Sequence, residues 1–303
     1  MNVVGRAVLA VTNRSTVRKL FSESAAGRRL SLRFVAGETI DDAAVAAADL
    51  NEMGARVSLD HLGEHVMDGT AAVAARDDYL ECLNRIHDDG LDANISVKLT
   101  QLGLGLDDDL AVESLGALAA RAADAGTTVT IDMEESELVE KTVAAFETVQ
   151  SQHGNIGIAV QSYLYRTPAD LDRIVEGGGL VRLCKGAYAE PTEVAHQTKD
   201  RVDSAFDALT RRLMATPGIT PAIATHDGER IDLTKQLADH RTEPWEFQML
   251  YGIRRNLQRS LIDGGYPLRV YVPYGTAWYP YLTRRMAERP ANIAFFMRAV
   301  AGK

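Results

Sequence analysis

The chain has 303 residues, 46% of them hydrophobic and 25% charged, so it is long enough to bury one large core. Its 33 basic and 42 acidic residues give a net charge of −9, which argues against a nucleic-acid partner. Two cysteines, Cys82 and Cys184, have no CxxC spacing, which excludes a disulfide scaffold or zinc ribbon and favours a cytoplasmic setting. No stretch reaches the roughly 18 apolar residues of a membrane helix. Any membrane contact is therefore expected to be peripheral, at the inner face of the plasma membrane.

A short apolar segment, a polar turn and an Ala/Leu/Glu-rich stretch recur along the chain. Composition and spacing predict helices over residues 40–53, 70–90, 107–125, 134–150, 168–176, 192–215, 228–239, 251–263 and 277–300. Between them lie predicted strands at 56–60, 94–99, 127–132, 156–161, 179–184, 220–226, 245–250 and 268–273. Strands that alternate with helices pair in parallel, and eight such units favour an α/β fold closed into a (β/α)8 TIM-like barrel, with room for distortion. An open doubly wound sheet remains the alternative, although its GxGxxG turn is absent.

The same pattern predicts how the chain is organised. No low-complexity linker or block of charge divides the sequence, so residues 1–303 are expected to form one catalytic domain. Since a barrel needs about 250 residues, residues 54–303 would form it and about 1–53 would be a helical N-terminal extension. The last helical stretch is expected to lie over the barrel mouth.

The predicted strands have two chemically different faces. In the third, Val129 and Ile131 alternate with Thr128 and Thr130, and the second, fourth and eighth strands show a similar division. Because side chains alternate across a strand, the branched apolar set should face the surrounding helices and the small or polar set the barrel axis. An ordinary barrel fills its interior with branched apolar side chains, so this one is expected to keep a polar mouth.

Seven of the eight strands end in a polar side chain on the inward set. The last inward residues are Asp60, Lys98, Asp132, Gln161, Arg182 with Cys184, His226, Leu250 and Tyr271. Barrel enzymes hold their catalytic groups at this carboxyl-terminal rim. Any single member could instead be satisfied in a buried ion pair, but burying so many polar groups is costly unless a ligand uses them.

Two of these strand ends should be neighbours. Lys98 and Asp132 end adjacent strands and could touch, either as a pair that contacts an amine or zwitterionic substrate or as a structural salt bridge. A strand-end lysine can also be a Schiff-base nucleophile. An aldolase or decarboxylase that uses Lys98 or Lys185 is therefore a rival reading, and a barrel that only binds an amino acid is another.

A cationic segment lies at the end of the fifth predicted strand. Arg182 and Lys185 are followed by Gly186, which lets the backbone approach a ligand closely. The two cations could stabilise a phosphate or the reduced form of a flavin, or they could be solvated on a loop. His226, which follows Thr225, could bind a cofactor or be a satisfied core histidine.

The last predicted helix carries the sharpest local pattern. Tyr281, Arg284, Arg285 and Glu288 share one helix face, which would form a carboxylate clamp over the mouth or an ordinary solvated surface. No metal site is predicted, because His61 and His65 are separated by a glycine and lie in a strand-end context.

Several runs taken together resemble a known family. ISVKLTQLGL, TIDMEES, VQSYLYRT, VRLCKGAY, ATHD, EFQMLYG and RVYVPYG…WYPYLTRRMAERPAN, in this order, resemble the flavin-dependent proline dehydrogenases of the compact monofunctional bacterial kind. The resemblance extends from about Arg33 to Arg298 and implies oxidation of L-proline to 1-pyrroline-5-carboxylate by hydride transfer to FAD. It also implies a membrane quinone as electron acceptor and a separate pyrroline-5-carboxylate dehydrogenase downstream.

The resemblance also assigns residues by position. Asp132 and Arg182 would be catalytic, and the substrate would be bound by Lys98, Tyr188, Leu250, Tyr271, Tyr281, Arg284 and Arg285. The cofactor would contact Met133, Gln161, Arg182, Lys185, Gly186, Ala187, Thr225, His226 and Glu288. Ala189 stands where the family often has a tryptophan, so one aromatic cofactor contact is not expected here.

Overall fold

Eight parallel strands form a closed barrel in the computed structural model, which describes residues 31–288, the side chains of 284–288 excepted. Consecutive strands are neighbours, and the first pairs with the last over Arg56↔Arg269 to His61↔Tyr274. The strands are β1 (Arg56–His61), β2 (Ala93–Val97), β3 (Val129–Ile131), β4 (Ile156–Gln161), β5 (Gly179–Cys184), β6 (Ile219–Ala224), β7 (Glu246–Leu250) and β8 (Leu268–Tyr274). The predicted (β/α)8 fold is confirmed.

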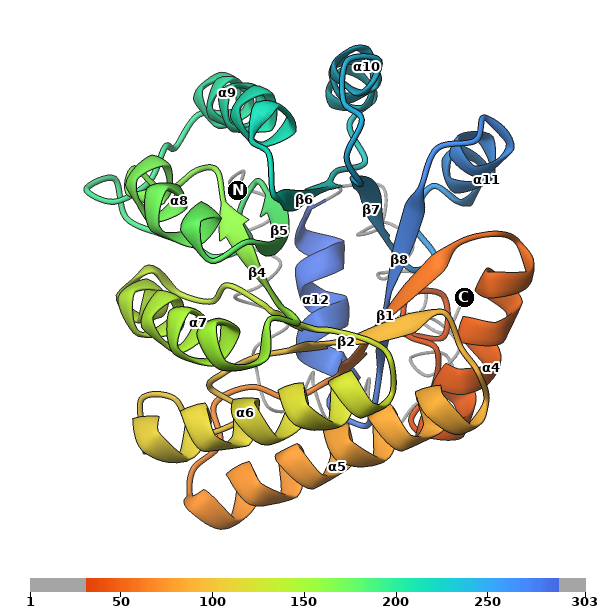
Figure 1. Cartoon of the computed structure of the whole chain (residues 1–303), viewed down its shortest axis with the longest axis vertical. Coiled ribbons are helices and arrows are strands. Elements are labelled where there is room, and N and C mark those ends of the chain that lie inside the picture. Colours follow the sequence, from red (N-terminus) through yellow and green to blue (C-terminus); the bar gives the residue numbers. More distant parts are fainter. Residues whose placement is uncertain (1–30, 289–303) are drawn as a thin grey trace, which may run out of the picture.

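Helices surround the ring of strands (Figure 1). The helix α12 (Trp278–Glu288) follows β8, and the helices that surround the ring are α4 (Ile40–Glu52), α5 (Gly69–Asp88), α6 (Asp108–Asp124), α7 (Val139–His153), α8 (Thr167–Glu176), α9 (Lys199–Ala215), α10 (Gly228–Ala238) and α11 (Arg255–Asp263). A short 3-10 helix, η1 (Ser136–Leu138), precedes α7. Their apolar faces pack on the outward-facing strand residues, such as Val57, Ile95 and Val129, all of which are fully buried.

One predicted helix is wrong over its first turns. Residues 192–198 were expected to be helical, but α9 begins only at Lys199. The chain there folds back on the loop after β4, where Leu164 and Ala195 form an isolated antiparallel bridge. The backbone N–H of His196 donates to the carbonyl of Tyr163 at 2.8 Å. Helical propensity gives way to these tertiary hydrogen bonds.

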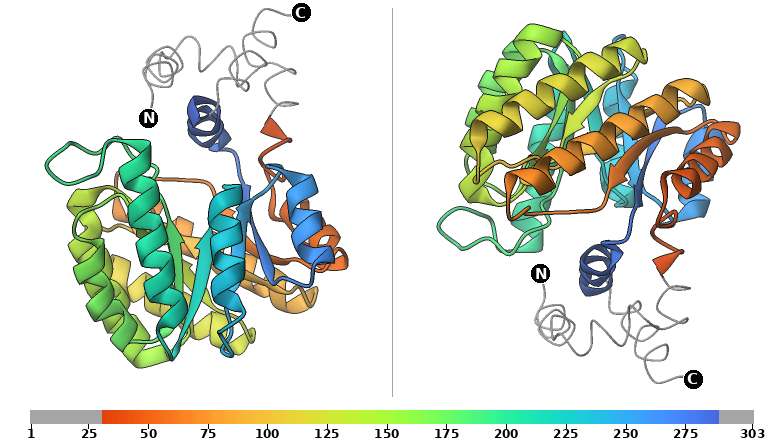
Figure 2. Two further views of the ribbon diagram at one scale, coloured as in Figure 1. Left: turned by 90° about the horizontal axis from the view of Figure 1, so that it is seen from above. Right: turned by 90° about the horizontal axis from the view of Figure 1, so that it is seen from below.

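The first and last helices of the described chain, α4 and α12, take different places around the barrel. α4, which precedes β1, packs outside the barrel against β1 and β8, where a helix after β8 would otherwise lie. α12 instead crosses the ring of strands when seen down the barrel, and it lies at one end of the barrel in the side views (Figures 1 and 2). The expectation that the last helix covers the mouth is therefore confirmed for its described part.

A small second core attaches α12 to the barrel. Its buried members are Phe34, Val35, Leu62, Trp278, Tyr279, Tyr281 and Leu282. The segment that supplies Phe34 is held by the β8 end, because the N–H of Ala36 donates to the carbonyl of Pro273 at 2.9 Å. The position of Tyr281 over the mouth thus depends on residues that precede the barrel.

Gly252 makes a close approach that this second core requires. It has a φ of +72°, and a Cβ there would lie 1.7 Å from the carbonyl oxygen of Arg33. Gly252→Ala is expected to lower the free energy of unfolding by about 2–5 kcal/mol, through left-handed strain and overpacking together. Gly265 has a φ of +77° with open space around it, so Gly265→Ala should lose only about 1–2 kcal/mol. Denaturant unfolding of both variants checks this, and equal losses would contradict it.

Within residues 31–288, no helix combines the length and hydrophobicity needed to cross a membrane.

Candidate active site at the carboxyl ends of the strands

A cavity of about 770 Å³ opens at the carboxyl ends of the strands. Thirteen of the residues proposed from the sequence line it, namely Lys98, Asp132, Met133, Arg182, Lys185, Gly186, Ala187, Tyr188, Thr225, His226, Leu250, Tyr271 and Tyr281. Gln161 lies behind the lining. The side chains of Arg284, Arg285 and Glu288 fall outside the part that the structure describes, although their backbone belongs to α12.

The floor of the cavity is a buried ion-pair cluster. Lys98 Nζ lies 2.8 Å from Asp60 Oδ1 and 3.5 Å from Asp132 Oδ2. The predicted neighbours Lys98 and Asp132 are thus brought together, but the shorter bond of Lys98 is to Asp60. Burial opposes the charge on Lys98, yet the carboxylates of Asp60 and Asp132 outweigh it and raise the pKa of the lysine. Burial raises the pKa of Asp60, despite the opposing effect of Lys98.

Asp132 connects this cluster to Arg182. Its Oδ1 accepts from Arg182 Nη1 at 2.5 Å and from Ser96 Oγ at 2.8 Å, and its Oδ2 accepts from Tyr271 Oη at 2.7 Å. Burial opposes the negative charge, but Arg182 and Lys98 outweigh it and hold the pKa of Asp132 below its usual value. Burial, with Asp132 and Asp60 nearby, raises the pKa of Tyr271 well above normal. The floor therefore contains the carboxyl groups of Asp60 and Asp132, the cations Lys98 and Arg182, and the protonated phenol of Tyr271.

A polar network runs from Gln248, which also lines the cavity, into the barrel interior. Gln248 accepts from Arg182 Nε at 2.5 Å and donates to Glu246 at 2.7 Å. Glu246 also accepts from Arg269 at 2.7 Å and from Arg56 at 3.2 Å. The expected polar inward set is thus present, but the sequence analysis did not single out Gln248 or Glu246. The alternation of EFQML in β7, which places both on the inward face, was the available signal.

Gln161 presents an unused acceptor beside the cavity. Its Nε2 donates to the carbonyls of Met133 at 3.0 Å and Glu134 at 2.8 Å, which fixes the amide orientation. Its Oε1 is buried and has no hydrogen-bond partner among the described residues. A buried acceptor without a donor is costly in a folded protein, and this one lies next to Met133, which lines the cavity, although Gln161 itself does not.

Lys185 and His226 are both held by neighbours while they line the cavity. Lys185 Nζ donates to Asp203 at the start of α9 and, at 3.0 Å, to Asp227. His226 Nε2 accepts from the backbone N–H of Leu250 at 3.0 Å, so this nitrogen carries no proton. His226 can therefore be both a hydrogen-bonded core histidine and a cofactor contact, because its ring still lines the cavity.

Packing inside the protein also explains why the residue at position 186, after β5, is a glycine. Gly186 has a φ of +127°, and a Cβ there would lie 2.4 Å from the ring of Tyr163. A side chain is therefore excluded by Tyr163 itself, whether or not a ligand approaches. The exposed backbone of Gly186 and Ala187 remains available at the rim of the cavity.

Comparison with known proteins decides the family. The sequence matches the Proline dehydrogenase family over residues 43–298. It is 38% identical to Proline dehydrogenase 1 of Bacillus subtilis subsp. natto, over 97% of this chain and 98% of the relative. It is 36% identical to Proline dehydrogenase of Deinococcus radiodurans, over 97% of both chains. This chain belongs to the proline dehydrogenase family. Its length is that of the compact, monofunctional bacterial members, and the reaction class is that of a proline dehydrogenase.

Solved structures show the same fold. The structure aligns with proline utilization A of Bdellovibrio bacteriovorus, inactivated by N-propargylglycine, with a TM-score of 0.79 and 22% identity. It also aligns with a mutant of proline utilization A from Bradyrhizobium japonicum with a TM-score of 0.75 and 24% identity. This chain is covered to 93% and 97%, but each solved chain only to 34%. The barrel of this proline dehydrogenase thus corresponds to about a third of those larger proteins.

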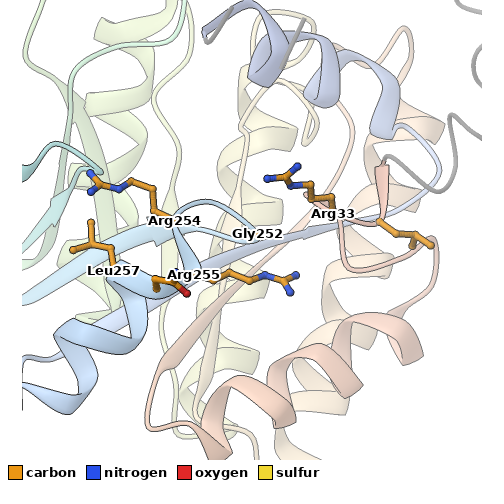
Figure 3. A pocket seen from close by; sticks show the side chains of 7 residues that line it. Arg33, Gly252, Arg254, Arg255 and Leu257 are labelled. Atoms are coloured by element: carbon orange, nitrogen blue, oxygen red, sulfur yellow. The ribbon is translucent and has the colours of Figure 1, made fainter. Parts of the chain in front are cut away.

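A second pocket adjoins the candidate active-site cavity. It measures about 820 Å³ and is lined by Arg33, Arg254 and Arg255 together with Leu32, Gly252, Asn256 and Leu257 (Figure 3). Arg254 lines both pockets, and its Nη1 donates to the carbonyl of His226 at 2.5 Å. Arg254, in the loop after β7, therefore presents its guanidinium group to both pockets.

One group of potential metal ligands lies outside this cavity. His65, Glu134 and Glu135 bring their ligand atoms within 4.8 Å of one another. Glu134 is already bonded to the hydroxyl of Thr100 at 2.5 Å, and His65 Nε2 lies 3.4 Å from Glu135. The sequence analysis weighed His65 only with His61. Glu135 Oε2 is buried and has no hydrogen-bond partner among the described residues.

Proposed function

We propose that this proline dehydrogenase oxidises L-proline to 1-pyrroline-5-carboxylate with FAD as its cofactor and passes the electrons to a membrane quinone. The observation that carries the proposal is the single cavity that unites the described substrate-side and cofactor-side residues. Residues 1–303 would act as one catalytic domain, cytoplasmic and peripheral at the inner face of the plasma membrane. A separate pyrroline-5-carboxylate dehydrogenase would consume the product.

The residues around the cavity fit a flavin. The unpartnered Oε1 of Gln161 suits an N–H donor of the flavin ring, and the exposed backbone at Gly186 and Ala187 suits its polar edge. Lys185 supplies a cation for the phosphates. Met133, Arg182, Thr225, His226 and Glu288 complete the proposed cofactor set. When bound, FAD supplies a two-electron acceptor that takes a hydride.

The chain's own residues would orient the substrate. Arg284 and Arg285 would hold the proline carboxylate, because paired guanidinium groups match its geometry. Tyr188, Leu250, Tyr271 and Tyr281 would wall the ring, and Lys98 and Asp132 would face the amine side. α12 would shield the site from water, so that positioning supplies much of the rate. The C5–H bond breaks with its electron pair leaving as hydride, the nitrogen lone pair forms the C=N bond, and the nitrogen proton leaves to solvent.

The Schiff-base rival fits the site poorly. A nucleophilic lysine needs a lowered pKa so that its amine is neutral. Lys98 instead has a raised pKa, because two carboxylates outweigh the effect of its burial. Lys185 is likewise bonded to two carboxylates, those of Asp203 and Asp227. Both lysines are therefore arranged as charged groups.

The kcat/KM for proline is expected to rise with pH across the neutral range. The substrate amine must lose its proton before its lone pair can expel the hydride. The raised pKa values of Lys98 and Tyr271 keep both protonated through this range, so the rise should follow the substrate amine. A profile of kcat/KM from pH 6 to 9 checks this, and a fall with pH would contradict it.

Coupled product analysis tests the proposed function. Wild-type enzyme with proline and an artificial electron acceptor should form one equivalent of 1-pyrroline-5-carboxylate for each two-electron reduction of the acceptor. Borohydride added with proline should leave no covalent adduct. Proline binding without acceptor reduction would favour a binding protein, and a borohydride-trapped lysine would favour the Schiff-base class.

A further inference from the structure

The guanidinium of Arg182 is fixed from two sides of the barrel. On one side its Nη1 donates to Asp132 at 2.5 Å and Ser96 at 2.8 Å, and its Nη2 lies 3.4 Å from Ser58 Oγ. On the other side its Nε donates to Gln248 on β7 at 2.5 Å. These groups fix the plane of the guanidinium, and Gln248 is its one hydrogen-bond partner from the β7 side among the described residues.

The orientation of the Gln248 amide is unambiguous. Its side chain is buried, with 3% of the residue exposed. Its Oε1 accepts from Arg182, which can only donate, and its Nε2 donates to the carboxylate of Glu246 at 2.7 Å. Reversing the amide would place donor against donor and acceptor against acceptor. Gln248 is therefore a neutral link with one polar atom for each neighbour.

The charges around Gln248 explain why the residue between Arg182 and Glu246 is neutral. Glu246 is 1% exposed and is compensated by Arg269 Nε at 2.7 Å and Arg56 Nη1 at 3.2 Å. Arg182 has Asp132 as its carboxylate partner, and Asp132 is shared with Lys98 at 3.5 Å. A carboxylate at position 248, which lines the cavity, would add a second negative charge against Arg182.

We propose that Gln248 is a positioning residue of the proline dehydrogenase reaction. It fixes the plane of Arg182 without offsetting its positive charge, so that this charge stabilises the negative charge that builds up in the cavity as substrate electrons arrive. The inference rests on the proposed function. Gln248 acts through Arg182 and is not itself a catalytic residue.

Gln248→Leu tests the link by removing both hydrogen bonds from a residue of similar size. Losing a hydrogen bond to a charged group should lower kcat about 10- to 100-fold, while the KM for proline changes less than about threefold. In the flavin-loaded enzyme the equilibrium constant for two-electron reduction should fall about tenfold, which is a shift of about −30 mV in the midpoint potential.

Gln150→Leu is the matched control. Gln150 is 6% exposed and also makes two hydrogen bonds, donating to the carbonyl of Gly177 at 3.0 Å and accepting from the N–H of Ile156 at 2.8 Å. It does not line the cavity. Gln150→Leu should lower the melting temperature and leave kcat and the midpoint potential unchanged.

Gln248→Glu keeps the test decisive if the leucine variant does not fold. A protonated glutamate reproduces the donor and acceptor of the amide, whereas its ionised form adds a charge. The position faces Arg182 from β5, Glu246 on β7 itself and Arg269 on β8, with the uncharged Ala224 on β6. Tyr271 lies two residues further along β8, opposite Leu250. The midpoint potential of the flavin in the Gln248→Glu variant should match that of the wild type at low pH. It should fall below the wild-type value as the carboxyl group of the new side chain ionises.

The outcomes separate this inference from the proposed function. If the Gln248 variants lose only thermal stability, as Gln150→Leu does, Gln248 is merely structural and the inference is overturned. A wild-type enzyme whose bound flavin is not reduced by proline would overturn the proposed function instead. Wild-type reduction by proline combined with lowered potentials in the Gln248 variants supports both.

Discussion

Asp132→Ala should lower kcat/KM for proline about 200- to 5000-fold. The substitution removes the acceptor shared by Arg182, Tyr271 and Ser96 and leaves Lys98 with one carboxylate fewer. Breaking a buried ion pair by removing one partner costs about 3–5 kcal/mol, which corresponds to this loss in rate if the cost appears in the transition state. Steady-state kinetics with an artificial electron acceptor measure it.

Asp170→Ala is the control for Asp132→Ala. The side chain of Asp170 on α8 is 8% exposed and pairs with Arg166 at 2.8 Å, outside the cavity. This variant should lose stability but retain its turnover per folded molecule. If Asp132→Ala kept its activity within tenfold, or if Asp170→Ala lost as much, the proposed role of Asp132 would be wrong.

Arg284→Met should raise the dissociation constant of proline about 100-fold and that of FAD less than about threefold. The prediction follows from the proposed carboxylate clamp, since a hydrogen-bonded charge pair contributes about 1.5–3 kcal/mol and methionine replaces the unbranched, flexible part of the side chain without its charge. α12 carries residue 284 one turn beyond Tyr281, which lines the cavity.

Two binding measurements decide the outcome for Arg284→Met. Titration of the loaded enzyme with a proline analogue gives the substrate affinity, and flavin fluorescence on release gives the cofactor affinity. Equal losses of both affinities would assign Arg284 to the stability of α12 instead of the clamp. Arg259→Met on α11, an exposed position away from the cavity, should change neither affinity.

The barrel was predictable because its signals are local. Alternation of strands and helices gave the fold, and the parity of Val129 and Ile131 against Thr128 and Thr130 gave the polar interior. Asn94 Nδ2 indeed donates to the hydroxyl of Thr130 at 3.1 Å inside the barrel. The irregular segment 192–198 was not predictable, since hydrogen bonds to a distant loop determine it.

The site was predictable as a set of strand ends but not as a network. Parallel strands bring their carboxyl ends together, so Lys98 and Asp132 had to be close. Which carboxylate takes the shorter bond depends on the barrel geometry, and it is Asp60. The connection from Arg182 through Gln248 to Glu246 crosses the barrel between strands that are not neighbours. Sequence periodicity contains no information about such a contact.

The absorption spectrum of the purified enzyme under anaerobic conditions tests the central claim most directly. The strand-end cavity, with its unpartnered Gln161 acceptor and its cations, is proposed to hold a flavin that proline reduces. The account predicts a yellow protein whose flavin bands bleach when proline is added. Flavin bands that are absent, or that persist with proline present, would contradict it.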